Sequence, residues 1–183
     1  MTTAPQHPAQ RFETLVLVHL DAAYGLARWL LHDEQRAADA TQEACVRAWR
    51  FFEGMASESP KAWFLTIVRN VCYDEWQANR LRATRELGLE ELPDTPLLDA
   101  EGCTVSPETL SVQASDARRL HQCLARLSAE HREVLVLREF EAMSYREISA
   151  VVGVPIGTVM SRLARARDTL ASELGAAGRR RVK

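Results

Sequence analysis

The sequence of 183 residues lacks the features that mark non-globular and membrane proteins. Glycine (8) and proline (7) are scarce and follow no repeat, which argues against collagen-like and disordered chains. Charged or polar residues interrupt every hydrophobic stretch, so no run approaches the roughly 18 apolar residues that a membrane span needs. The first ten residues lack the basic start and apolar core of a secretory signal. We therefore expect a cytoplasmic protein with no membrane insertion.

The sequence also lacks the residue clusters that carry catalysis or bind metal. Its four cysteines stand far apart, without a C-x-x-C pair or a histidine at ligand spacing, so neither a disulfide framework nor a zinc site is indicated. The histidines are scattered, and neither a phosphate-binding glycine loop nor a carboxylate paired with a base is visible. We expect no enzyme activity, no cofactor, no metal and no small-molecule substrate.

A net charge of -2 conceals two segments of opposite charge. Residues 154–183 contain seven basic residues and two acidic ones, whereas residues 86–115 contain acidic residues and no Lys or Arg. A basic terminus is typical of proteins with a polyanionic partner such as nucleic acid. An acidic segment that contains proline and few aromatics is typical of a solvated linker. Ordinary surface charge is the alternative explanation.

Helical periodicity dominates the chain, and alternating strand patterns are almost absent. Apolar residues recur at helical spacing over residues 12–31, 35–52 and 60–82, and again around Leu124 and Leu137. The sequence therefore predicts an all-α fold with two small helical domains. The predicted segments are a disordered N-terminus (1–11), a first helical domain (12–85), a flexible acidic linker (86–115), a second helical domain (116–174) and a basic tail (175–183).

A helix-turn-helix pattern lies in the second domain. Ser144 and Glu147 have the spacing of a capping box, which predicts that a helix begins there. Gly153 permits the left-handed turn that would end this helix, and a second helix would start at Pro155 or Ile156. Ile148, Val151, Val152, Val159 and Leu163 would all face inward. This arrangement is typical of motifs whose second helix enters the DNA major groove.

The outer face of the second helix carries side chains that suit DNA. An Arg side chain donates two parallel hydrogen bonds to guanine, and a Ser or Thr hydroxyl binds a phosphate or a base edge. The candidate residues for this contact are Thr158, Ser161, Arg162 and Arg165. The alternative is a three-helix bundle whose Arg face is only solvated.

Three segments resemble parts of one known protein family. Residues 130–170, which include GTVMSRLARAR, look like region four of the extracytoplasmic-function group of bacterial sigma factors. DATQEACVRAWRFF (39–52) looks like a part of region two, and AWFLTIVRNVCYDEW (62–76) looks like the promoter-melting helix that follows. The resemblance implies a non-enzymatic initiation factor with three partners: core RNA polymerase, promoter DNA and an anti-sigma factor.

The resemblance also implies roles for residues in the first domain. The polymerase-binding positions of the group correspond here to Asp39 and Gln42, with Glu43 and Arg47 nearby. A plain solvated helix face is the alternative for these four residues. The positions near unpaired bases of the minus-ten element correspond to Ser57, Ser59, Lys61, Asn70 and Arg80.

The helix-turn-helix would then read the minus-35 element. Met160 stands where members of the group usually carry Lys or Arg, which implies that one contact is lost or apolar. Two rival functions fit parts of the sequence. A stand-alone helix-turn-helix regulator would leave the first domain unexplained, and a protein-interaction adaptor would not need the DNA-facing arginines.

Overall fold

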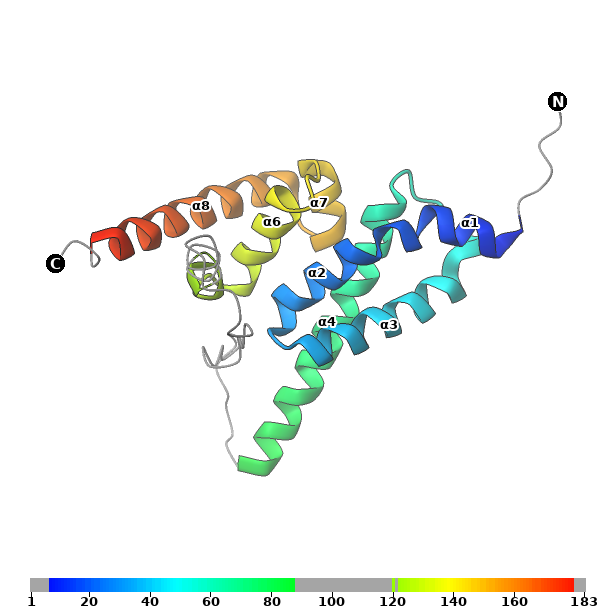
Figure 1. Cartoon of the computed structure of the whole chain (residues 1–183), viewed down its shortest axis with the longest axis horizontal. Coiled ribbons are helices and arrows are strands. Elements are labelled where there is room, and N and C mark those ends of the chain that lie inside the picture. The colour runs from blue at the N-terminus through cyan, green and yellow to red at the C-terminus, as the bar shows by residue number, and fades with distance from the viewer. Residues whose placement is uncertain (1–6, 88–119, 121, 180–183) are drawn as a thin grey trace, which may run out of the picture.

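The computed structural model describes residues 7–87, 120 and 122–179, and every regular element in these ranges is helical (Figure 1). The N-terminal helical group holds α1 (Pro8–Leu15), the 3₁₀ helix η1 (Leu17–His19), α2 (Leu20–Leu31), α3 (Glu34–Phe51), the 3₁₀ helix η2 (Phe52–Gly54) and α4 (Pro60–Leu87). The C-terminal helical group holds α6 (Ala129–Glu139), α7 (Tyr145–Val152) and α8 (Ile156–Arg179). The predicted all-α fold is confirmed.

The helix expected over residues 12–31 is broken in its first half. Val16 has φ -117° and ψ -53°, and a 3₁₀ turn follows before α2 begins. A 3₁₀ helix advances by about 120° per residue instead of about 100°, so the apolar stripe rotates at the turn. As a result Phe12, Val16 and Leu26 are buried, whereas Leu20, which the apolar period over residues 12–31 places on the same stripe, is 41% exposed.

A row of alanines lets α3 lie close to α2 and α4, and the three helices pack against one another. The side chains of Ala37, Ala40, Ala44 and Ala48 are buried. The apolar period over residues 35–52 predicts that Trp49 faces inward as well, but it is 48% exposed and its ring lies edge-on to the ring of Phe12, with centroids 5.1 Å apart. The buried stripe therefore uses the smallest side chains, because only they permit this close approach.

The third helix extends beyond the end expected near residue 82. It begins at Pro60, as the proline predicts, and continues to Leu87. The rest of the predicted linker, from residue 88, lies outside the described residues, as do the N-terminal residues 1–6 and the end of the basic tail from residue 180.

The two helical groups pack against each other. Helix α2 contacts α6, and α4 contacts α7. Buried side chains of both groups form one continuous hydrophobic cluster, which runs from Phe12 to Ala166. Figure 1 shows α6 and α7 beside α2 and the upper part of α4, while the C-terminal half of α8 and the lower half of α4 project away from the body.

One described segment, Pro8–Leu31, is long and apolar enough to cross a membrane by length and composition alone. Core helices of globular proteins meet the same criterion. In this structure the segment is bent at Val16 and contributes Phe12, Ala23 and Leu26 to the shared hydrophobic cluster.

Candidate nucleic-acid interface

The helix-turn-helix forms as its local signals predict. The Ser144 hydroxyl accepts a hydrogen bond from the backbone N–H of Glu147 at 3.2 Å, and the Glu147 carboxylate accepts one from the backbone N–H of Ser144 at 2.9 Å. The backbone N–H and the hydroxyl of Ser144, which both donate to the Glu147 carboxylate, lower the pKa of Glu147. Gly153 ends α7 with φ 71°, and the chain bends by 99° between α7 and α8. The capping box and the turn glycine are therefore confirmed.

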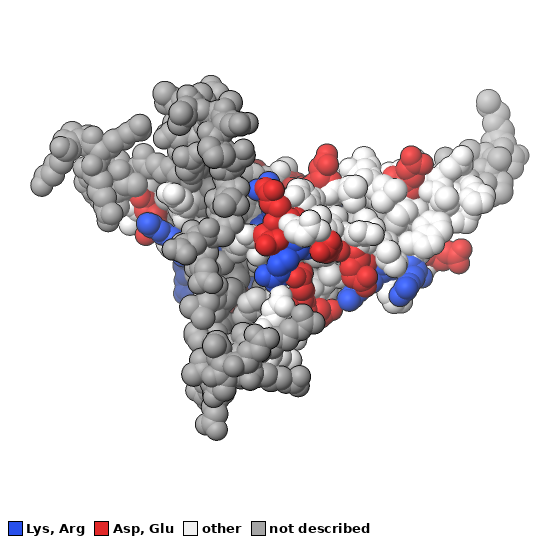
Figure 2. All heavy atoms as spheres, turned by 60° about the horizontal axis from the view of Figure 1, so that its bottom comes forward, with Lys and Arg blue, Asp and Glu red and all other residues white. Residues whose placement is uncertain are grey.

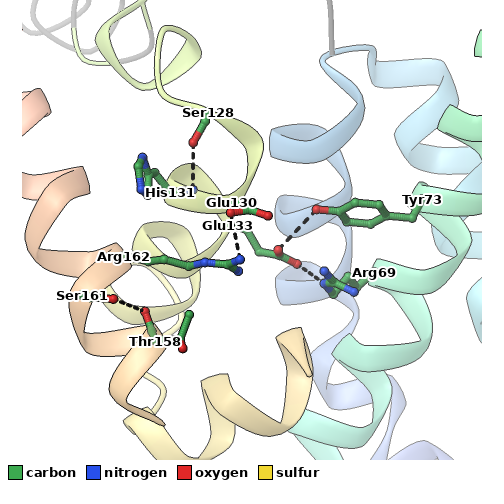
Figure 3. Close-up of polar contacts among 9 residues, drawn as sticks. All are labelled: Arg69, Tyr73, Ser128, Glu130, His131, Glu133, Thr158, Ser161 and Arg162. Atoms are coloured by element: carbon green, nitrogen blue, oxygen red, sulfur yellow. Dashed lines mark hydrogen bonds and ion pairs between the residues drawn. The ribbon is translucent and has the colours of Figure 1, made fainter. Parts of the chain in front are cut away.

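The four candidate residues of α8 differ in how free their side chains are. Ser161 and Arg165 are exposed, and the Ser161 hydroxyl donates to the backbone oxygen of Thr158 at 3.0 Å (Figure 3). Thr158 is half-buried. Arg162 is only 18% exposed and forms an ion pair of 2.8 Å with Glu130 of α6. Met160, beside them, is 52% exposed.

The four candidate residues of α3 lie on its exposed side. Asp39 and Gln42 are both exposed, one turn apart. Arg47 forms ion pairs of 2.9 Å with Glu43 on the same helix and with Asp74 on α4. Hydrogen bonds to these two carboxylates raise the pKa of Arg47. Figure 2 shows acidic and basic side chains interleaved on the described part of the surface that it presents.

The candidate residues for the minus-ten element spread over the loop before α4 and over α4 itself. The Ser57 hydroxyl donates to the backbone oxygen of Ser59 at 3.1 Å. Asn70 is exposed on α4. Arg80 belongs to α4, but its side chain lies outside the described residues.

Two of these candidates contact the C-terminal helical group. The Ser59 hydroxyl donates to the Glu147 carboxylate at 2.9 Å, and the Lys61 ammonium lies 2.8 Å from the Glu141 carboxylate. Lys61 also donates to the backbone oxygen of Glu141 at 2.8 Å. Ser59 and Lys61 are therefore brought together by an interface between the two helical groups.

This interface also holds a buried polar network that the sequence patterns did not predict. Arg69 of α4 pairs with Glu133 of α6, and the Tyr73 hydroxyl donates to the same carboxylate at 3.5 Å (Figure 3). The Arg69 guanidinium also lies 4.4 Å from the centre of the Tyr73 ring. Burial raises the pKa of Glu133, and the charge of Arg69 opposes this shift.

A weak signal for this network exists in the sequence. Arg132 and Glu133 are two charged residues directly before the apolar run Val134–Leu137, and a buried helix tolerates charge only where it is paired. The partner of Glu133 lies 64 residues away in the chain, so no local pattern identifies it.

Comparisons with known proteins agree with the arrangement of the two helical groups. The family model for sigma-70 region 2 matches residues 15–82, and the model for sigma-70 region 4 matches residues 117–170. The RNA polymerase sigma-H factor of Pseudomonas aeruginosa is 32% identical over 165 residues, which cover 87% of this chain and 83% of the relative. The ECF RNA polymerase sigma factor SigL of Mycobacterium tuberculosis is 33% identical over 147 residues, which cover 79% of this chain and 78% of the relative.

A solved structure matches most of the chain. The sigma factor RpoE of Bartonella quintana, crystallised with the anti-sigma factor NepR, has a TM-score of 0.74 and 26% sequence identity. The match covers 91% of this chain and 98% of that one. Sequence and fold thus agree over both helical groups, and the chain belongs to the ECF group of the sigma-70 family, whose members direct RNA polymerase to promoters.

Proposed function

We propose that α8 reads the minus-35 element of the promoters that this sigma factor recognises. The observation that carries this proposal is the position of Ser161 and Arg165, which are exposed on a helix that follows a helix-turn-helix bend of 99°. Arg165 suits a bidentate contact with guanine, and Ser161 suits a phosphate or a base edge. Thr158 and Arg162 complete the surface, and the basic tail (175–183) adds contacts with phosphates.

We further propose that α3 binds core RNA polymerase. Its exposed residues Asp39 and Gln42, with the Glu43–Arg47 pair beside them, offer polar groups at the spacing of one helical turn. The polymerase contact would then lie on α3, on a different element from α8.

We assign recognition of the minus-ten element to the first domain (12–85). Ser57, Ser59 and Asn70 offer hydrogen-bonding groups for bases removed from the stack, and Lys61 and Arg80 offer positive charge for the backbone. The linker (86–115) would join this domain to the second domain (116–174).

An anti-sigma factor is the third proposed partner. The Bartonella quintana relative was crystallised with such a protein, and its fold matches this chain over both helical groups. The chain would act in the cytoplasm, without inserting into the membrane and without catalysing a reaction or binding a small-molecule substrate.

Reconstituted transcription tests the proposal. Core RNA polymerase and a library of promoter sequences are incubated with and without this chain, and the transcripts are sequenced. We expect initiation only in the presence of the chain, from promoters that share a minus-35 and a minus-ten element. Binding of the free chain to duplex DNA without stimulation of polymerase would instead support a stand-alone regulator.

A further inference from the structure

The exposed side of α8 carries two parallel rows, each made of residues four positions apart. Residues at this spacing lie one above the other along a helix. The polar row consists of Gly157, Ser161 and Arg165, and the apolar row consists of Ile156, Met160 and Ala164. All six residues are exposed. Of these six, the proposed function uses only Ser161 and Arg165.

The apolar row is not part of the hydrophobic core. Val159, Leu163 and Ala166 form the inward face of α8 and are at most 1% exposed. Ile156 and Met160, in contrast, are 44% and 52% exposed. Single exposed apolar residues are ordinary on protein surfaces, but these two lie one helical turn apart on the proposed DNA-facing side. Both side chains are therefore available to a partner of α8.

The charge around the apolar row favours a polyanionic partner. Residues 154–166 contain Arg162 and Arg165 but no Asp or Glu. Arg162 is directed toward α6, where it pairs with Glu130 at 2.8 Å (Figure 3). Arg165 is exposed in the row next to that of Met160. An exposed cation beside an apolar strip suits a DNA groove, where phosphates border the edges of the bases.

The four bases differ in what they offer to an apolar side chain in the major groove. Guanine and adenine present hydrogen-bonding groups there, cytosine presents an amino donor, and thymine alone presents a methyl group. Covering a donor or an acceptor with an apolar side chain leaves it without a partner, which is unfavourable. A methyl group packs well against methionine, whose flexible side chain adapts to its surroundings. Thymine is therefore the base that fits Met160.

We propose that Met160 selects thymine in the minus-35 element by packing against its 5-methyl group. This inference rests on the proposed function of α8, and it adds a second base to the guanine contact proposed for Arg165. Met160 and Arg165 are five residues apart, which corresponds to about 7.5 Å along the helix axis. Successive base pairs are about 3.4 Å apart, so the thymine should lie within about three base pairs of the guanine.

Replacement of thymine by deoxyuridine tests the inference, because deoxyuridine pairs with adenine in the same way but lacks the methyl group. Holoenzyme is assembled from core polymerase and the full-length chain, and a promoter is chosen from the transcription library. Each thymine of the minus-35 element, on either strand, is replaced in turn, and binding is measured in competition with the unmodified promoter. We expect one or two replacements to lower the affinity about fourfold each, as for the loss of one buried methyl group.

Three variants, each checked for folding by circular dichroism, attribute this effect to Met160. Met160→Ala shortens the side chain at an exposed position and should make the holoenzyme bind thymine and deoxyuridine promoters alike. Val18→Ala is the matched control, because it shortens another exposed apolar side chain, in the N-terminal helical group, and should keep the fourfold difference. Met160→Lys should favour guanine over thymine at this position in a promoter selection, since the ammonium donates to guanine acceptors.

Four results would overturn the inference. The selected minus-35 element contains no thymine, or the deoxyuridine effect persists in Met160→Ala. The parental holoenzyme binds thymine and deoxyuridine promoters equally while Met160→Ala binds every sequence more weakly, which would make Met160 a contact with the sugar-phosphate backbone. Met160→Ala loses affinity for core polymerase, which would place Met160 in a contact with protein.

Other measurements decide the proposed function. If the holoenzyme initiates at promoters that share a minus-35 element but no deoxyuridine effect depends on Met160, this inference is wrong and the proposed function stands. If the parental chain never stimulates polymerase, the proposed function fails and the inference fails with it.

Discussion

Arg132 joins the two helical groups through backbone carbonyls. Its side chain is 1% exposed, and its guanidinium donates to the oxygens of Leu124, Ala125 and Leu127 within its own group. It also donates at 3.0 Å to the oxygen of Trp29 in α2. Burial lowers the pKa of Arg132 to about 10, so the side chain stays charged at neutral pH. The cation adds hydrogen bonds to backbone carbonyls near helix ends, where intrahelical donors run out.

Replacing Arg132 should destabilise the fold strongly. Arg132→Met keeps a long side chain but removes four hydrogen bonds to backbone carbonyls, so we expect the free energy of unfolding to fall by about 3 kcal/mol. Urea denaturation followed by circular dichroism measures the change. Arg146→Met, at an exposed position of α7, is the control and should stay within about 0.5 kcal/mol of the parental value.

Arg165 and Arg162 lie on the same helix but have different surroundings. Arg162 is paired with Glu130, whereas Arg165 is exposed. We expect Arg165→Ala to relax sequence preference at one or two base pairs of the minus-35 element, by roughly 1–3 kcal/mol. Truncation after residue 178 should instead weaken binding to all sequences alike and reduce the salt dependence. Selection of promoter variants at fixed salt distinguishes the two effects. If Arg165→Ala instead lowers the affinity for all sequences alike, Arg165 contacts a phosphate and not a base.

At the scale of the elements, the helix-turn-helix was predictable because its signals are local. A capping box and a glycine specify the ends of α7 through the backbone of a few neighbouring residues. The break at Val16 and the rotated face of α3 were not predictable in this way. Both features depend on how closely α2, α3 and α4 approach one another. The buried alanines of α3 show this close approach only in the packed structure.

The turn glycine gives a prediction with an internal control. Gly153 has φ 71°, and a β-carbon added there would meet no neighbouring atom within 4 Å, so Gly153→Ala has only the backbone cost of the left-handed conformation, about 1–2 kcal/mol. Gly157 lies in the first turn of α8 with equally open surroundings and no positive φ. Gly157→Ala should stabilise the protein by about 0.5 kcal/mol. Thermal or urea unfolding of both variants checks the opposite signs.

The proposed role of the exposed face of α3 in polymerase binding can be tested independently of folding stability. We expect Asp39→Ala with Gln42→Ala to weaken binding to core polymerase, while the free energy of unfolding changes by no more than about 0.5 kcal/mol per position. Gln10→Ala with Glu13→Ala is a matched control, since these residues are exposed on α1 at the same spacing. A polarisation titration against core polymerase compares the two double variants. Equal affinities would remove α3 from the polymerase contact.

At the scale of the molecule, the sequence predicted two helical domains but not how they pack. Each domain has its own periodicity, so composition and pattern were sufficient to identify both. The contacts between them join residues far apart in the chain, such as Ser59 with Glu147 and Arg69 with Glu133. Such pairs leave no periodic signal, and only the folded arrangement shows that candidate promoter contacts are engaged within the protein.

The shared hydrophobic cluster predicts that both helical groups unfold together. Buried residues of the two groups form one cluster, and Arg132 and the Trp29–Phe140 ring contact of 5.8 Å cross the interface. All four tryptophans lie in the N-terminal helical group, at positions 29, 49, 63 and 76, so their fluorescence reports on that group and, through Trp29, on the interface. Circular dichroism reports on the helices of both groups.

We therefore expect the two signals to give the same midpoint and slope in a urea titration, which is the behaviour of one cooperative unit. Glu141→Lys should separate them, because it weakens the interface without touching the core of either helical group. Glu173→Lys, with the same charge change within one group, should leave the transitions coincident. Two distinct midpoints in the parental chain would show that the groups unfold independently and that their packing contributes little to stability.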